Sequence, residues 1–228
     1  MQMPSFFDDV PRLRVRDPLA QMLGSAQDGV FEYGYGDVVR LTGHSCPTVA
    51  AAAYWLTWLA LRALYPHALP ERGGIRVEFR DNARVGSTGV TATVVQMLTG
   101  AAGSSGFKGL VGRFSRAGLQ RFAPEIPLSL RFTRLDNGCA VDAAVDLDMA
   151  PPDPALVRLL QRCADDTADD AAAAELGRLW QQRVACLLLE LAHDTGVFVI
   201  RKVERAREVP VLRPRRFIAP APQPDIAI

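Results

Sequence analysis

One uncharged apolar run dominates the hydrophobic pattern of this chain. Residues 48–61 read TVAAAAYWLTWLAL and directly follow the pentapeptide 43–47, GHSCP. The run is shorter than the ~20 apolar residues that cross a bilayer, so it predicts a buried core helix rather than a membrane span. Proline is favoured at the first position of a helix, which predicts that this helix starts at Pro47 with Cys46 as its N-cap.

Shorter patterns predict the remaining elements. Apolar residues at spacings of three and four indicate helices, and alternation indicates strands. Asp136-Asn137-Gly138 predicts a tight hairpin turn, because Asn-Gly accommodates the positive φ angles that such turns need. The predicted helices cover 19–23, 90–98, 154–163 and 171–194, with a helical turn at 37–41, and the predicted strands cover 30–35, 75–79, 111–122, 128–135, 139–147 and 197–200.

These elements predict an α+β fold, in which a mixed or antiparallel sheet packs against the buried core helix and further helices. We divide the chain into an irregular N-terminal lead-in (1–29), an α+β domain (30–205) and an Arg/Pro-rich tail (206–228). Within the domain, the core motifs occupy 30–150 and a helical and strand extension occupies 151–205. The tail fits either an arm that wraps a neighbouring subunit or a disordered end.

Composition narrows the functional classes. The chain has 228 residues, is 49% hydrophobic and carries a formal net charge of +1, which favours neither a nucleic-acid nor a membrane-surface binder. The acidic N-terminus does not resemble a signal peptide, so we expect a cytoplasmic protein with reduced thiols. Its four cysteines are scattered without a CxxC pair, so no disulfide framework is expected.

Cys46 is the cysteine with the most suggestive neighbourhood. A helix N-terminus carries free N–H groups and partial positive charge, which favour the thiolate that binds metal or attacks carbon. His44 lies two residues upstream and can face the same point. Tyr33, Tyr35 and Asp37 are close enough in sequence to reach this region; the alternative is that the two tyrosines simply cover the core helix.

A second candidate feature is the Gly/Ser-rich loop that follows the helix predicted at 90–98. Ser104 and Ser105 supply hydroxyl groups there, and Lys108 supplies a positive charge. Such a loop can cradle an anion. It lacks the spacing of a P-loop or of a dinucleotide-binding motif.

The ordered motifs resemble the FmdE-like family, which is named after an accessory chain of formylmethanofuran dehydrogenase, over residues 30–150. The resemblance rests on Gly-His-x-Cys-Pro (43–47) at a helix start, the strand at 75–79, a second helix ending in Leu-Thr-Gly (98–100), and the Gly/Ser loop followed by Phe-Lys-Gly-Leu (107–110). It implies an α+β domain, often dimeric, whose zinc site includes His44 and Cys46. Many members carry another cysteine at the start of the second helix, and some end in a zinc ribbon; this sequence has neither. The family's namesake assists its enzyme and does not carry the catalytic centre.

Three functions follow from these residues. The first is a stand-alone accessory or binding protein of cofactor, one-carbon or redox metabolism that holds zinc, or another divalent transition metal, at His44 and Cys46. Zinc takes about four ligands, so the others would come from a second subunit of a homodimer, from solvent, or from Asp37, Asp81, His193 or Cys139. The second is a metal-independent cysteine enzyme that uses Cys46 with His44. The third is a module that binds a small anion or cofactor at the Gly/Ser loop. His44 and Cys46 could also merely cap the core helix. We expect a small-molecule ligand, and neither nucleic acid nor membrane as a partner.

Overall fold

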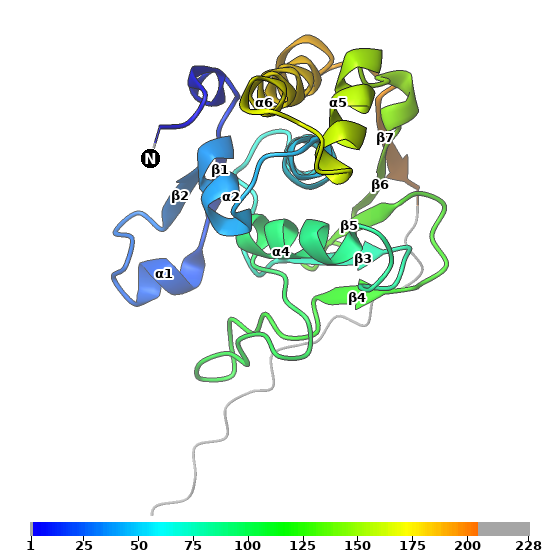
Figure 1. Cartoon of the computed structure of the whole chain (residues 1–228). Helices are drawn as coiled ribbons and strands as arrows, with labels where there is room; N and C mark the ends of the chain where they lie inside the picture. The colour runs from blue at the N-terminus through cyan, green and yellow to red at the C-terminus, as the bar shows by residue number, and fades with distance from the viewer. Residues whose placement is uncertain (1, 205–228) are drawn as a thin grey trace, which may run out of the picture.

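A computed structural model describes residues 2–204 of the protein and has the predicted α+β fold. The described part contains six α-helices, a two-stranded antiparallel sheet and a five-stranded mixed sheet (Figure 1). The tail at 206–228 lies outside the described residues. Among the residues that are described, no helix is long and apolar enough to cross a membrane.

Four strands of the large sheet, β3, β5, β6 and β7, lie close to their predicted bounds. Its order is β4-β3-β5-β6-β7, with β3 and β4 parallel and every other pair antiparallel. The hairpin between β5 and β6 turns at Asn137 and Gly138, and Gly138 has the expected positive φ of +73°. The last strand, β7, pairs with β6. The strands are β3 (Ile75–Phe79), β4 (Gln120–Phe122), β5 (Leu130–Arg134), β6 (Ala140–Val145) and β7 (Phe198–Val203).

The N-terminal residues are more ordered than the sequence predicts. The pattern at 1–17 predicts irregular chain, yet β1 (Leu13–Arg16) pairs with β2 (Val30–Tyr33), and a 3-10 turn covers Ser5–Asp8. The side chains of Leu13 and Val15 are buried in the main core, which explains why this strand is stable. The division expected between residues 29 and 30 therefore falls between two paired strands. Helix α1 (Pro18–Met22) connects them.

The predicted core helix runs through the centre of the molecule. Its first part, η2 (Thr48–Trp55), is a π-helix, and it continues into α3 (Leu56–Leu64). Trp55 and Tyr54 are fully buried, and both find hydrogen-bond acceptors: Trp55 Nε1 donates to the carbonyl of Ala192 (2.6 Å) and Tyr54 Oη to that of Pro11 (2.8 Å). These bonds join the core helix to both ends of the domain.

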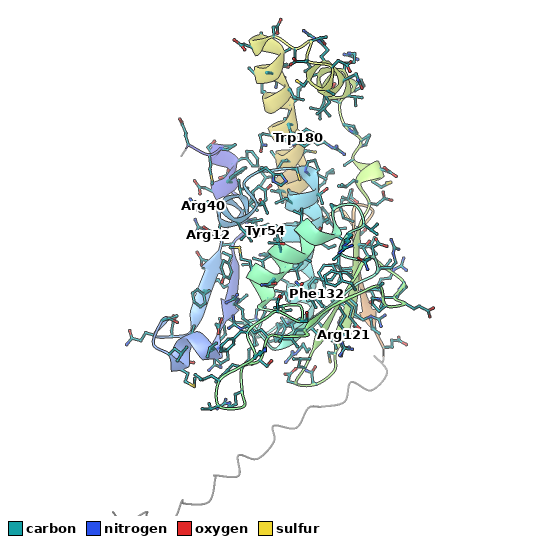
Figure 2. The ribbon with its side chains drawn as sticks, turned by 60° about the horizontal axis from the view of Figure 1, so that its bottom comes forward. Arg12, Arg40, Tyr54, Arg121, Phe132 and Trp180 are labelled. Carbon is teal, nitrogen blue, oxygen red and sulfur yellow. The ribbon has the colours of Figure 1, made fainter. Side chains whose placement is uncertain are left out.

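The other helices surround the core helix. In Figure 1, α4 lies on one side of it, and α5 and α6 lie on another. Figure 2 shows that α5 and α6 extend beyond the rest of the domain, with Trp180 near the base of α6. The helices are α2 (Tyr35–Thr42), α4 (Thr88–Thr99), α5 (Pro154–Ala164) and α6 (Asp170–Ala185), and α6 continues as a π-turn, η4 (Cys186–Glu190).

Two predicted elements differ from the structure. The segment at 111–122 is strand only at its end, in β4, because Val111 and Phe114 have positive φ angles of +47° and +61° that no strand accommodates. The helix predicted at 171–194 stops at Glu190. His193, expected in its last turn, lies in the loop that leads to β7.

Candidate functional site

The loop that carries His44 and Cys46 is a short connection between two helices. It begins at Gly43, which ends α2 in the left-handed conformation (φ +77°) while its N–H donates to the carbonyl of Val39 (2.9 Å). Glycine adopts this conformation without steric cost. At Pro47 the backbone angles are already helical. The histidine and the cysteine therefore lie on a short loop whose two ends, Gly43 and Pro47, are held by the helices on either side.

Cys46 is the N-cap of the core helix, as the sequence predicts. Its carbonyl accepts the first helical hydrogen bond, from the Ala50 N–H (2.8 Å), and its Sγ accepts from the Val49 N–H (3.4 Å). The side chain is half-buried. The first turn of the core helix thus directs one N–H at the sulfur.

Ser45, between the two candidate ligands, is held by side chains from two other elements. The Trp180 Nε1 donates to the Ser45 carbonyl (2.8 Å), and the Ser45 hydroxyl donates to Gln181 Oε1 (3.0 Å). The hydroxyl of Tyr35 lies 2.8 Å from Ser45 Oγ and is the donor, because the Ser45 hydrogen is already used. Burial raises the pKa of Tyr35 far above its ordinary value, so the phenol keeps that proton.

The sequence suggests both Tyr33 and Tyr35 as neighbours of this loop. Tyr35 does reach it, whereas Tyr33 lies near the Arg72 guanidinium, 5.6 Å from ring centroid to Cζ. The sequence does not predict Trp180 and Gln181 as part of the site. They come from α6, some 135 residues along the chain, and the sequence near the motif contains no signal for them.

His44 is exposed, and its tautomer follows from one hydrogen bond. Its Nδ1 lies 3.0 Å from the carbonyl oxygen of Thr42. A carbonyl only accepts, so Nδ1 carries the hydrogen and, in the neutral ring, Nε2 keeps a lone pair. Metal-bound histidines in proteins have the same arrangement, with the second ring nitrogen donating to a carbonyl or a carboxylate.

Asp37 has structural partners of its own, and Asp81 lies on a different element from the His44 loop. Asp37 lies in the first turn of α2, where Oδ2 accepts from the Gly34 N–H (2.9 Å) and Oδ1 pairs with Arg40 (2.7 Å). Asp81 is exposed just after β3, beside a hollow of about 140 Å³ that also borders the entrance of α4. Asp37 thus acts as a helix-capping residue.

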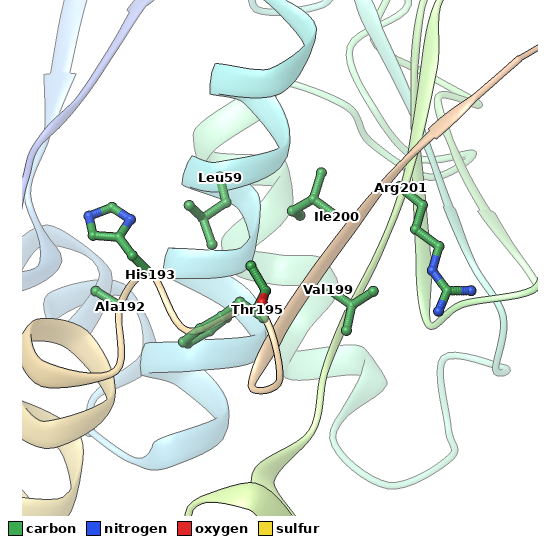
Figure 3. A pocket seen from close by; sticks show the side chains of 8 residues that line it. Leu59, Ala192, His193, Thr195, Val199, Ile200 and Arg201 are labelled. Atoms are coloured by element: carbon green, nitrogen blue, oxygen red, sulfur yellow. The ribbon is translucent and has the colours of Figure 1, made fainter.

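His193 lies beside the core helix, and Cys139 lies near the far end of that helix. His193 contacts the edge of Trp55, with ring centroids 5.9 Å apart, at a hollow of about 400 Å³ between the core helix and β7 (Figure 3). Cys139 is exposed at the hairpin, whose Arg134 donates to the carbonyl of Leu64 at the end of α3. The two helical segments of eight and nine residues separate this end from Cys46 by about 25 Å.

The Gly/Ser loop contributes exposed residues and an unexpected group of arginines. Ser104, Ser105 and Lys108 are all exposed, and Ser105 borders a hollow of about 400 Å³. The same hollow is lined by Arg72 and Arg116, which bind the buried carboxylate of Asp17. The sequence contains no local signal for this cluster, because its members lie 55 and 99 residues from Asp17.

Within residues 2–204, no three His, Cys, Asp or Glu side chains form a group that could hold a metal ion. Asp37, Asp81, His193 and Cys139 therefore do not combine with His44 and Cys46 into a three-ligand site. No protein-family model matches the sequence, and no curated protein matches it.

Proposed function

We propose that the chain is a metal-binding accessory protein in which His44 and Cys46 supply half of a zinc site. The observation that carries this proposal is the hydrogen bond from His44 Nδ1 to the Thr42 carbonyl, which leaves Nε2 available as a ligand. Cys46 follows two residues later, with a helix N–H directed at its sulfur. Imidazole nitrogen and thiolate sulfur are the donors that zinc and similar divalent transition metals prefer.

The number of ligands indicates how such a site is completed. Two ligands from one chain are fewer than zinc takes, and the described residues supply no third one nearby. A two-fold homodimer would repeat the exposed loop and bring two histidines and two cysteines to one ion. That set is a closed Cys₂His₂ arrangement, which is typical of a structural zinc site.

The surroundings of the loop suit this role. Three side chains on other elements hold Ser45, so the backbone between the two ligands is fixed before metal binds. A preorganised loop loses little conformational entropy on binding. Zinc in such a site would supply cross-linking between the two chains, and with an open coordination position it would supply Lewis-acid chemistry. A place in cofactor, one-carbon or redox metabolism is the part of the proposal that rests on family resemblance.

Metal analysis of untagged protein tests this proposal. We expect about half a zinc ion per chain together with a dimer in light scattering, and loss of both in His44→Asn and Cys46→Ser. Matched controls are His67→Asn and Cys139→Ser, which change an exposed histidine and an exposed cysteine elsewhere and should keep the zinc. Cobalt-loaded protein should show a thiolate-to-metal absorption band. Cys46→Ser should lose this band, and Cys139→Ser should keep it. Equal zinc in wild type and both loop variants would contradict the proposal.

A second candidate function is a metal-independent cysteine enzyme. The free, half-buried thiol of Cys46 at the start of the core helix supports it, with the Val49 N–H directed at Sγ, because a cysteine beside a base can act as a nucleophile. Rapid alkylation of Cys46 in metal-free protein, with a rate that falls in His44→Asn, would support this function over the first. A rate independent of His44 would remove the histidine from such a mechanism.

A further inference from the structure

Four arginines surround a hollow that is separate from the His44 loop. The hollow has a volume of about 460 Å³ and lies between the start of α1, the segment before β3 and residues 112–116, which lead to β4. Its volume is in the range of small-molecule sites, about 300–1,000 Å³. Its charged lining consists of Arg16, Arg72, Arg113, Arg116 and Glu71.

Beneath the arginines lies one buried carboxylate. Asp17 is 2% exposed and is the N-cap of α1. Its oxygens accept from Arg116 Nη2 (2.8 and 2.6 Å) and from Arg72 Nη1 (2.7 Å). One negative charge thus faces two positive charges, and the two guanidiniums keep a net charge of about +1.

Arg72 is fixed in place by the rest of the structure. Its side chain is 13% exposed, its Nη2 donates to the Met97 carbonyl (2.9 Å), and its guanidinium faces the rings of Phe31 and Tyr33. Its Nε is buried and has no hydrogen-bond partner among the described residues. A cation held in this way is partly dehydrated, which strengthens its attraction for an anion.

Arg16 and Arg113 add positive charge that no ion pair among the described residues neutralises. Both are exposed, and neither pairs with a carboxylate in the described part of the chain: Arg16 donates to Gln21 (3.2 Å), and Arg113 faces the ring of Phe114. Glu71 is the single acidic residue of the lining. With Asp17 included, four positive charges meet two negative ones.

From this arrangement we infer that the hollow binds a small phosphate-bearing molecule. Guanidinium groups match phosphate oxygens with paired hydrogen bonds, and several converging arginines favour a ligand with two or more negative charges. Phe114 and Leu19 also line the hollow and provide apolar surface for the organic part of such a ligand.

Titration calorimetry with pyrophosphate at constant ionic strength tests this inference. Each charge-assisted hydrogen bond corresponds to about tenfold in affinity. We therefore expect Arg113→Gln and Arg16→Gln each to raise the Kd by about tenfold. Arg158→Gln is the matched control, because Arg158 is also exposed but lies on α5. Melting temperatures without ligand would verify that all three variants fold.

Several outcomes would overturn the inference. They are the absence of pyrophosphate binding by wild type, an equal loss in Arg158→Gln, and tighter binding of a short single-stranded DNA than of pyrophosphate. Cys46→Ser, measured in metal-free buffer, should keep the wild-type Kd, so this result is independent of the proposed zinc site. Loss of binding in that variant would contradict the location at the arginines.

Discussion

Replacement of Asp17 tests whether its carboxylate holds the arginine cluster together. Asp17→Asn keeps a side chain that can cap α1 but removes the charge shared by Arg72 and Arg116. Both arginines are largely buried, with side chains 13% and 18% exposed. Breaking a buried ion pair by removing one partner costs about 3–5 kcal/mol, because the other charge stays buried without compensation. We expect that loss in the free energy of unfolding.

Comparison of Asp17→Ala with Asp17→Asn separates the contribution of the helix cap from that of the ion pairs. It removes the acceptor for the Leu19 and Ala20 N–H groups as well, which adds about 1 kcal/mol. For a chain of this size, each kcal/mol corresponds to about 2–4 °C in Tm, so Asp17→Asn should melt about 6–20 °C below wild type. Urea unfolding followed by circular dichroism measures both variants. A loss below about 1 kcal/mol in Asp17→Asn would refute the reasoning, since surface ion pairs contribute that little.

The pH dependence gives an independent check on the same residue. Burial raises the pKa of Asp17, but the Ala20 N–H and the guanidiniums of Arg116 and Arg72 together lower it more, so the pKa lies below its ordinary value of 3.8. The stabilisation is therefore complete well above pH 3.8 and is lost as the pH falls through the lowered pKa. The stability difference between wild type and Asp17→Asn should shrink on acidification. A difference that grows at acid pH would contradict this sign.

Three further measurements test other parts of the structure. Asp142→Asn should lose about 3 kcal/mol of unfolding free energy in urea. Asp142 is 4% exposed, and its carboxylate accepts two hydrogen bonds from Arg131 on the neighbouring strand (2.6 and 2.8 Å). An unchanged unfolding midpoint would contradict this. Gly138→Ala should lose about 1–2 kcal/mol from backbone strain alone, since φ is +73° and no atom lies within 4 Å of an added Cβ; equal stability would show that the turn relaxes. In timed alkylation followed by mass spectrometry, exposed Cys139 should react before Cys186, whose pKa is raised by burial and a nearby carboxylate, and the reverse order would be inconsistent with these environments.

The features that sequence predicts best are those whose cause is local. Pro47 at a helix start, Gly100 after a helix and the Asn137-Gly138 turn each follow from the conformation of one or two residues, and each is found where it is expected. The core helix follows from a long apolar run in the same way. The α+β fold could therefore be derived from patterns that span fewer than twenty residues.

The features that sequence misses depend on contacts between distant segments. The segment at 111–119 contains strand-forming residues, but the bond from the Arg116 N–H to the Phe107 carbonyl (2.8 Å) belongs to a folded-back loop. The contacts of Ser45 with α6 and of Asp17 with two arginines likewise join residues that no local pattern relates. Positions His44 and Cys46 could be selected from sequence, whereas the side chains that fix their loop could not.

The arginine cluster contains two arginines that pair with Asp17 and two that pair with no carboxylate among the described residues. This difference decides which arginines support a binding site. Strand β1 has four residues and α1 has five, too short to be stable alone, so this corner of the domain needs tertiary contacts. Arg72 and Arg116 meet that need through Asp17, and a stabilising role is sufficient to explain them. Arg16 and Arg113 stabilise no carboxylate in the described residues, yet they line the same hollow. Like charges placed together without such a gain cost energy by repulsion. An anion that neutralises them when bound accounts for their position, and so the case for the site rests on these two arginines.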